Sequence, residues 1–430
     1  MKKIKFIDLF AGIGGLRSGF EQAFNECQIE TECVMTSEIK EHAIKVLKKN
    51  YAHGKFVGDI TQVTDEEIPD FDFLLAGFPC QAFSAAGKRL GFLDTRGTLF
   101  FEVERIIKAK QPYGFILENV EGLVNHDKED KTRPIGRTLE TILQSLTNLG
   151  YDVSWEVLDS QHFNVPQSRK RIFIVGTKNT NIRLDNFPVQ TSKLKDVLDS
   201  GLETIDSGFT AALLKHYDLK DIVGKSIKDK RGGKNNIHSW DLELKGPVTK
   251  EQKELLNALM KARRNKKWAS IIGIKWMDGM PLTLQQIETF YEHPQLEELL
   301  EDLVQKGYLK FEHPKDILTN RNVRTPRTDL PKGYNIVAGK LSFEFSAILD
   351  PNSIAPTIVA TDVNKLGVVD GQGIRQLTTT ECARLFGFSD NFQFDVNKKE
   401  EVFDLLGNTI VITVAKAISE RLASAYLALR

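Results

Sequence analysis

The stretch FDFLLAGFPCQAFS, residues 71–84, predicts a buried strand that ends at a sharply defined loop. Residues 71–76 form an apolar run with the length of a buried strand. Pro79 has no N–H to donate, so it ends the strand and leaves Cys80 on a loop at the carboxyl end. That edge binds ligands in open α/β sheets. Cys80 is therefore a candidate nucleophile, although a cysteine in an intracellular protein is more often a small buried side chain.

Strands and helices alternate on both sides of this stretch. Further strands are expected at residues 5–9, 32–37, 113–117, 153–158 and 171–176. Helices are expected at residues 16–24, 41–51, 98–110 and 135–149. This alternation predicts an α/β fold built on a doubly wound, mostly parallel sheet.

The alternation breaks at about residue 177, which predicts a first domain at 1–177 and a smaller inserted one at 178–370. Residues 371–430 are regular again, with helices expected at 378–386 and 411–427, and return to the first domain. Inside the insertion, about residues 249–311, three helices and a strand resemble a winged helix-turn-helix. A helical insertion with a core of its own explains the same pattern equally well. The helices are expected at 249–264, 283–291 and 295–306, and the strand at 308–311.

Length and composition fit two globular domains. The chain has 430 residues, of which 41% are hydrophobic and 27% charged, and no run is expected to span a bilayer. The basic start, MKKIKF, turns directly into the first strand, so a signal peptide is not expected. The four cysteines form no CxxC pair, which favours a reducing, cytoplasmic setting over zinc or disulfides. With 58 basic and 58 acidic residues, net charge decides nothing about nucleic acid.

A glycine turn follows the first strand, in the sequence FIDLFAGIGG at residues 6–15. Glycines allow a backbone to approach a ligand closely, although the spacing is not that of a dinucleotide fold. Glu38 ends the second strand, where a carboxylate can accept both hydroxyls of a ribose. Asp59 precedes the third strand and can accept an adenine amino group. Either acid alone is more typical of a surface charge, but their succession favours an adenosine-type cofactor.

Two further motifs follow at strand ends. Glu118 in ENV lies at the end of a buried strand, where its pKa can be raised, although a plain loop cap is the alternative. Arg169 and Arg171 in QSRKR alternate along an extended chain and so point the same way. Both fit phosphate or carboxylate binding, or a surface pair.

Taken in order, these motifs resemble those of the cytosine-C5 DNA methyltransferases. The matching segments are FIDLFAGIGG, SE, GD, GFPCQAFS, ENV, QSRKR, RQLTTTECARLFGF and LLGNTIV. They cover roughly residues 1–178 and 371–430. The resemblance implies the class I S-adenosylmethionine-dependent methyltransferase fold, with the inserted domain in the place of target recognition.

The resemblance also implies a mechanism and its residues. Cys80 would add to C6 of cytosine as a thiolate, and Glu118 would hydrogen-bond the ring at N3 and the amino group. Arg169 would hold the base, with Arg171 in support. S-adenosylmethionine would be held by Phe10, Gly12, Gly14, Glu38, Asp59, Phe78, Pro79, Asn408 and Thr409. No metal is expected.

The implied substrate is double-stranded DNA, from which the target cytosine is flipped out. Residues 87–97 resemble the loop that closes over it. The family suggests the modification half of a bacterial restriction-modification pair: a cytoplasmic monomer, off the membrane, linked to its endonuclease by function and not by binding. If the insert binds DNA, Lys266 and Lys267 are expected to contribute.

Three alternatives compete with this interpretation. A tRNA cytosine-C5 methyltransferase would carry a Cys-Phe-Thr segment and a short recognition region, and this chain has neither feature. A catalytically idle DNA-binding relative would lack Cys80 or Glu118. A nicotinamide dehydrogenase is suggested only by the glycine turn, and the later motifs argue against it.

Overall fold

The structure is a computed structural model that describes residues 3–79, 99–128, 130, 132–229, 233, 235–317, 323–337, 343–396 and 398–428. The chain divides into two compact units. Unit 1 contains Met1–Asp199, Pro351–Asn364 and Leu377–Arg430, and unit 2 contains Ser200–Asp350 and Lys365–Gln376.

Unit 1 is built on a seven-stranded sheet in the order β3-β2-β1-β4-β5-β7-β6. The strands are β1 (Ile4–Leu9), β2 (Thr31–Ser37), β3 (Lys55–Val57), β4 (Phe73–Gly77), β5 (Gly114–Val120), β6 (Asp152–Asp159) and β7 (Lys170–Thr177). Strands β1 to β5 are parallel to one another, and β7 is antiparallel to both β5 and β6. The sheet is therefore mostly parallel, as predicted, and only the short strand β3 was not anticipated.

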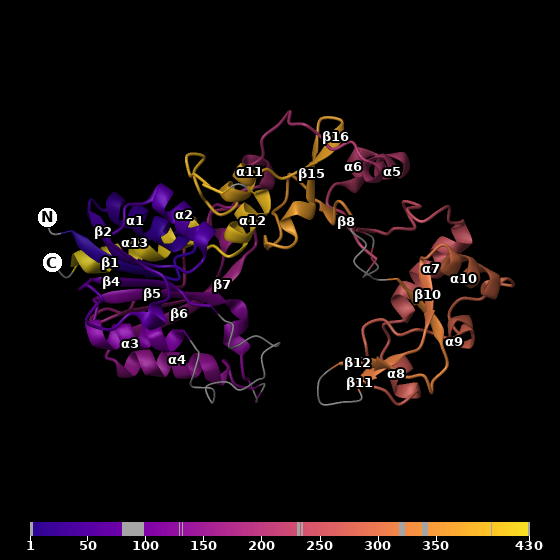
Figure 1. The fold of residues 1–430 in the computed structure, drawn as a ribbon, viewed down its shortest axis with the longest axis horizontal. Helices are drawn as coiled ribbons and strands as arrows, with labels where there is room; N and C mark the ends of the chain where they lie inside the picture. Colours follow the sequence, from indigo (N-terminus) through magenta and orange to yellow (C-terminus); the bar gives the residue numbers. More distant parts are fainter. Residues whose placement is uncertain are drawn as a thin grey trace. The chain divides into compact units, whose positions relative to one another are not determined.

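Helices cover both faces of this sheet. Helices α1 (Gly15–Glu26), α2 (Glu41–Asn50) and α13 (Ile412–Ala428) lie over one face, and α3 (Phe100–Lys110) and α4 (Arg137–Asn148) lie over the other (Figure 1). The unit also contains α11 (Thr379–Arg384) and α12 (Lys399–Gly407). Two helical layers around one sheet confirm the doubly wound fold.

Apolar strand residues supply the core on both faces. Leu74, Ala76 and Leu117 are fully buried and pack in one cluster with α3 and α4. On the other face α1 and α13 approach so closely that a Cβ on Gly19 would lie 2.6 Å from Cβ of Ala415. Close backbone approach of this kind requires a glycine. The C-terminal helix is thus part of the core of the N-terminal fold.

One helical stretch, Lys399–Ala428, is long and apolar enough to cross a membrane by length and composition, so the expectation that no run is apolar enough was wrong. The stretch joins α12 to α13 across a break near residues 408–411. In the structure 67% of its apolar window is buried. Its apolar residues pack inside unit 1, as those of a core helix do.

The first boundary between the units lies later than the predicted residue 177. Residues 178–199 stay with unit 1, where Arg421 of α13 donates hydrogen bonds to the carbonyls of Arg183 and Asp185. Residues 351–364 also belong to unit 1, because Leu194 and Lys195 donate backbone hydrogen bonds to Ser353 and Pro351. Local polarity did not reveal these long-range contacts.

Unit 2 contains a five-stranded sheet in the order β16-β15-β14-β8-β9. Its strands are β8 (Ser226–Ile227), β9 (Asn236–Ile237), β14 (Ala347–Ile348), β15 (Leu366–Asp370) and β16 (Gly373–Gln376). With α5 (Gly208–His216) and α6 (Leu219–Ile222) they enclose a small core that includes Leu213, Phe345 and Ile374.

A second core in unit 2 belongs to the predicted helical insert. It is formed by α7 (Lys250–Ala262), α8 (Lys267–Ile271), α9 (Leu284–Glu288), α10 (Leu296–Gln305), β10 (Leu309–Glu312) and β13 (Gly333–Ile336). A short hairpin, β11 (Lys315–Ile317) with β12 (Arg324–Pro326), lies between β10 and β13 in the chain. The three predicted helices and the strand are present, and α8 was not anticipated.

Candidate active site

The glycine turn between β1 and α1 has a strained backbone that leaves open space. Phe10, Gly12 and Gly14 all have positive φ, of 55°, 57° and 83°. Positive φ is uncommon for a phenylalanine, so the surrounding structure holds Phe10 in this conformation. A Cβ added to Gly12 would meet no atom within 4 Å. The turn therefore offers room for a ligand at the carboxyl end of β1.

Glu38 holds this turn in place. Its Oε2 accepts a hydrogen bond of 2.8 Å from the backbone N–H of Gly12. Its Oε1 accepts two more, both of 2.8 Å, from the N–H groups of Ile39 and Lys40. The carboxylate thus links the ends of β1 and β2, the two strand ends at which an adenosine group was expected.

Asp59 lies at the end of the next parallel strand. It caps the 3₁₀ turn Ile60–Gln62, with its Oδ1 accepting hydrogen bonds from the N–H and hydroxyl of Thr61 at 3.0 and 2.8 Å. The side chain is exposed. Glu38 and Asp59 therefore follow adjacent parallel strands at one edge of the sheet, although β3, the strand before Asp59, was not anticipated.

Tyr51 is a support of the glycine turn that sequence reasoning missed. Its hydroxyl lies 3.1 Å from the carbonyl oxygen of Gly14 and 2.6 Å from Oγ of Ser18. A Cβ on Gly14 would lie 2.7 Å from the tyrosine ring, so only glycine fits there. Burial raises the pKa of Tyr51, so the phenol stays protonated and can donate to the carbonyl. No local sequence signal identifies this tyrosine.

Asp8, on β1 just before the turn, is a second residue that the sequence analysis did not single out. It is buried, and within the described part of the chain its Oδ2 has no hydrogen-bond partner. Burial raises the pKa of Asp8 to about 7, and the nearby positive charge of Arg17 opposes that rise. The sequence feature that could have identified Asp8 is a carboxyl group inside a predicted apolar strand.

In the chain, Phe78 and Pro79 separate the end of β4 from Cys80. Phe78 is buried, and its carbonyl accepts a hydrogen bond of 2.9 Å from Nδ2 of Asn119. Pro79, the next residue, is exposed. Cys80 and the proposed closing loop at residues 87–97 lie outside the described residues.

Glu118 lies beside the end of β4. It pairs in register with Gly77, and a Cβ on Gly77 would lie 3.5 Å from Oε2 of Glu118. Its Oε1 lies 3.1 Å from Nε of Arg171, which projects from the antiparallel strand β7. Burial raises the pKa of Glu118, while Arg171 and then Arg169 oppose the rise. The site thus holds a half-buried carboxyl group with one paired arginine.

The two arginines have different partners within the protein. Arg169 is buried, and its guanidinium donates hydrogen bonds of 2.8–3.1 Å to the carbonyls of Ile358, Gly407 and Thr409. Burial, and next the like charge of Arg171, lower the pKa of Arg169. Of the pair, Arg171 is therefore the arginine that contacts Glu118, and Arg169 ties the C-terminal segment to the site. Sequence spacing could not distinguish them, because the alternation predicts the same direction for both side chains.

Asn408 and Thr409 join the site from the far end of the chain. Thr409 is buried, and its Oγ1 would lie 2.7 Å from a Cβ on Gly15, the first residue of α1. Nδ2 of Asn408 donates to the carbonyl of Asp404 at 2.7 Å. The C-terminal motif therefore contacts the start of the helix that follows the glycine turn.

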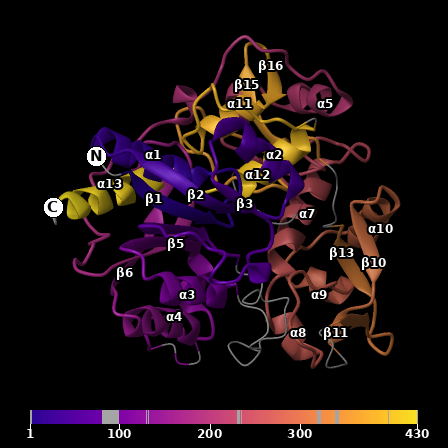
Figure 2. The ribbon, with the colours of Figure 1, turned by 60° about the vertical axis from the view of Figure 1, so that its left-hand side comes forward.

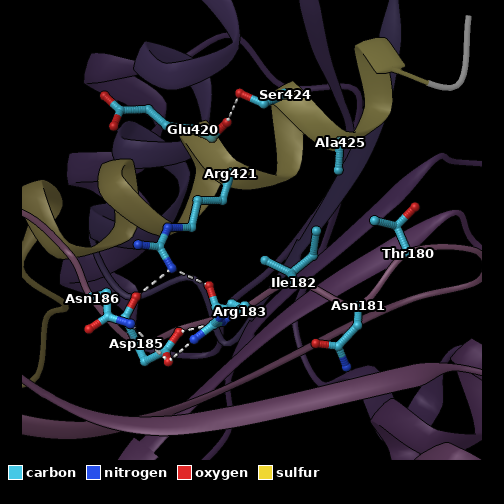
Figure 3. Close-up of a pocket in the computed structure, with 10 residues that line it drawn as sticks. All are labelled: Thr180, Asn181, Ile182, Arg183, Asp185, Asn186, Glu420, Arg421, Ser424 and Ala425. Carbon is cyan, nitrogen blue, oxygen red and sulfur yellow. Dashed lines mark hydrogen bonds and ion pairs between the residues drawn. The ribbon is translucent and has the colours of Figure 1, made fainter.

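Two surface pockets lie near opposite edges of this sheet. One, of about 460 Å³, is lined by Val120, Glu121, Gly122, Ser168, Lys170, Arg171 and Thr357, beside the Glu118–Arg171 pair. The other, of about 570 Å³, lies between residues 180–186 and α13, where Arg421 is hydrogen-bonded (Figure 3). The second pocket follows the end of β7, and that end pairs with the start of β5. Glu118 lies near the other end of β5, so the second pocket is at the opposite edge of the sheet from Glu118. Of these two pockets, the first adjoins the Glu118–Arg171 pair.

Within the described ranges, no three His, Cys, Asp or Glu side chains form a group that could hold a metal ion.

The C-5 cytosine-specific DNA methylase model matches residues 4–424. The chain belongs to this family. Type II methyltransferase M.NlaIV of Neisseria lactamica is 58% identical over 422 residues, covering 98% of this methylase and 99% of that one. M.NgoBV of Neisseria gonorrhoeae is 57% identical with the same coverage. M.BanI of Aneurinibacillus aneurinilyticus is 43% identical, covering 98% of this methylase and 96% of the relative.

Solved structures agree on the fold. The methylase matches the Dnmt2 methyltransferase of S. pombe with a TM-score of 0.53 at 17% identity, over all of both chains. It matches a DNA modification methyltransferase from an E. coli prophage with a TM-score of 0.51 at 21% identity, covering 99% and 100%. The predicted methyltransferase fold is thus confirmed. The family also confirms cytosine-C5 methylation of DNA as the activity, in preference to the tRNA alternative.

Proposed function

We propose that this methylase transfers a methyl group from S-adenosylmethionine to C5 of a flipped-out cytosine within a short duplex sequence, through a covalent bond between Cys80 and C6. The observation that carries the proposal is the half-buried Glu118–Arg171 pair beside the end of β4, the strand that ends at Gly77 just before Phe78, Pro79 and Cys80. A carboxyl group paired with Gly77, three residues before the thiol, can act on the same base as that thiol.

The glycine turn fits the methyl donor. Open space over Gly12 and the exposed carboxylate of Asp59 would receive its adenosine part. Glu38 would accept the ribose hydroxyls with its remaining lone pairs while it holds the turn. Phe10, Gly14, Phe78, Pro79, Asn408 and Thr409 are proposed to complete this pocket. When bound, S-adenosylmethionine supplies an activated methyl group on a sulfonium centre.

The protein's residues prepare cytosine to accept that group. The Cys80 thiolate adds to C6, and the ring electrons that this addition releases make C5 nucleophilic. Glu118 hydrogen-bonds N3 and the amino group, and a raised pKa favours the protonated form that can donate to N3. After C5 takes the methyl group, loss of the C5 proton to a base reforms the double bond and expels Cys80. Arg171 orients Glu118, and Arg169 orients the C-terminal segment.

We further propose that unit 2 recognises the target sequence. The enzyme would act as a monomer in the bacterial cytoplasm and protect its sites from a partner restriction endonuclease. That partner would be linked to it through function, without a stable complex.

The test is transfer of labelled methyl from S-adenosylmethionine to duplex DNA of mixed sequence, followed by bisulfite mapping. We expect label at C5 of one cytosine in a fixed short sequence. Label in tRNA, or at no fixed sequence, would contradict the proposal.

Cys80→Ser tests the covalent step, because serine is a far weaker nucleophile toward C6 at neutral pH. We expect loss of methyl transfer together with retained DNA binding. Cys27→Ser is the matched control, since Cys27 follows α1 and is free and half-buried. Equal activity of the wild type and Cys80→Ser would exclude the thiol mechanism.

A further inference from the structure

The helical insert of unit 2 has the strand and helix order of a winged helix. Apart from α8 and the hairpin β11–β12, the elements along the chain are α7, a strand-like segment at Leu282, α9, α10, β10 and β13. Leu282 forms an antiparallel bridge with Tyr334 of β13, and β13 also pairs with β10. Strand β13 is therefore central in a three-stranded antiparallel arrangement. In helix-turn-helix proteins the helix in the position of α10 usually enters the major groove.

The outer face of α10 is negatively charged, which disfavours its entry into the major groove of DNA. Its outer face carries Glu297, Glu298 and Glu301, all exposed, while Leu300 and Leu303 face the core. The 30 residues at 276–305 contain seven carboxylates and no lysine or arginine. Duplex DNA carries about one negative charge per 1.7 Å of its axis, so this surface would be repelled.

The opposite charge gathers around α8. Five of the seven residues at 261–267 are lysine or arginine, and Lys261, Lys266 and Lys267 are exposed. In the part of the chain that the structure describes, Lys266 and Lys267 have no ion pair. Their ammonium groups lie over the rings of Trp276 and Trp268, at 5.7 and 4.1 Å from the ring centres. Such contacts keep the charges near the surface without neutralising them.

Trp276 and Arg324 complete this surface. The Trp276 side chain remains 37% exposed, and its indole N–H donates to the carbonyl of Arg264 at 3.2 Å. Arg324 on β12 donates to the carbonyls of Trp276 and Lys275 at 2.8 and 3.4 Å. The hairpin is thereby joined to the α8 region, and its guanidinium adds positive charge there.

The two charged surfaces lie apart within the insert. In both ribbon views α8 and the β11 strand of the hairpin lie at one end, and α10 lies toward the other (Figures 1 and 2). An extended strand of phosphates that contacted α8 would thus be kept away from the acidic helix.

We propose that the insert binds the DNA phosphate backbone through Lys261, Lys266, Lys267, Trp276 and Arg324, here termed the basic face, and that α10 points away from DNA. The insert would therefore contact DNA through a surface other than the helix that usually enters the major groove in this fold. This inference rests on the proposed DNA substrate and specifies the surface that meets it.

The test compares Lys266→Gln/Lys267→Gln with wild type in duplex DNA binding over a salt series, using the full chain. Each lost phosphate contact lowers the slope of log K against log salt by about 0.9, so we expect a slope reduced by about 1.8 and roughly tenfold weaker binding at physiological salt. Both side chains are exposed, so folding should be retained, and the melting temperature checks this.

Two matched variants serve as controls. Lys250→Gln/Lys253→Gln removes the same charge from the other end of α7; Lys250 is eleven residues before Lys261, about 16 Å along the helix and beyond the Debye length of about 8 Å. Glu297→Gln/Glu298→Gln removes two carboxylates from α10. We expect both controls to keep the wild-type slope.

The outcomes separate the two proposals. If wild type neither binds nor methylates duplex DNA, the proposed function itself fails. If wild type does both and Lys266→Gln/Lys267→Gln keeps the wild-type slope, only the basic face is excluded. Markedly tighter binding by Glu297→Gln/Glu298→Gln would place α10 near the phosphates and overturn the inference.

Discussion

The candidate active site in unit 1 and the basic face in unit 2 both depend on charge, but they hold it in opposite ways. The side chains of Glu118 and Arg171 are only 11% and 19% exposed, and they are paired at 3.1 Å. Lys266 and Lys267 are exposed and lie over aromatic rings. Salt screens exposed charges strongly and buried pairs weakly. Substitutions in the site should therefore change chemistry at any salt concentration, whereas substitutions on the basic face should change binding in a salt-dependent way.

The largest expected effect is that of Glu118→Gln. The amide keeps the shape but cannot give a proton to N3, so kcat should fall by about 10²–10⁴-fold. The fall should be the same at low and high salt, with DNA affinity nearly unchanged. Single-turnover methyl transfer at two salt concentrations measures both quantities.

Glu121→Gln is the control for that prediction, since it removes a half-exposed carboxylate three residues further along the chain. It should leave kcat within about twofold of wild type, because exposed pairs contribute little. A strongly salt-dependent loss in Glu118→Gln would break the contrast between buried and exposed charge.

A second effect concerns Asp8 and pH. A carboxyl group whose pKa is about 7 in the folded protein and 3.8 in the unfolded chain binds more protons when folded. Its contribution to stability is therefore full below pH 3.8 and is lost as pH rises through 7. Asparagine does not titrate, so Asp8→Asn should not lose this stability as pH rises. Between pH 5 and pH 8, its free energy of unfolding should increase by roughly 2–3 kcal/mol relative to that of wild type.

Urea unfolding at the two pH values measures this difference. Asp70→Asn is the control, because that side chain is almost fully exposed, and its pH dependence should match wild type. An Asp8→Asn variant with the pH dependence of wild type would show that the buried carboxyl group does not titrate in this range.

The smallest expected effect is that of Tyr51→Phe. Loss of the hydroxyl removes one hydrogen bond to the glycine turn, worth about 1 kcal/mol. The KM for S-adenosylmethionine should rise about fivefold, with kcat and DNA affinity unchanged. Steady-state kinetics with the methyl donor varied would measure it.

Tyr151→Phe is the matched control, because its buried hydroxyl donates a similar bond of 2.8 Å to the carbonyl of Pro112, away from the turn. It should leave the KM for the donor unchanged. Equal effects in both variants would mean that Tyr51 supports the fold in general and not the turn in particular.

Sequence reasoning was most successful where function depends on local order. The apolar run before Gly77 and the glycines after β1 predicted strands and a turn, because burial and positive φ leave local signatures. Parallel pairing then brings the ends of β1, β2 and β4 to one edge. The sequence alone therefore predicts that edge as the site.

Sequence reasoning was least successful for residues whose hydrogen-bond partners lie far away in the chain. The division between Arg169 and Arg171 depends on the carbonyls of Ile358, Gly407 and Thr409, which lie some 190–240 residues away. The boundary near residue 199 depends on contacts with residues 351–353 and α13. Periodicity and composition contain no information about which distant residues are in contact.

The sequence by itself thus determined the family, the doubly wound sheet and most residues proposed for the candidate site. Contiguous motifs of strand, turn and helix specify these features. Only the tertiary structure decided which arginine meets Glu118, that Tyr51 supports the glycine turn, and that the acidic α10 and the basic α8 lie at different ends of one insert. Those facts depend on distances between segments far apart in the chain, which are fixed only when the cores of the two units pack.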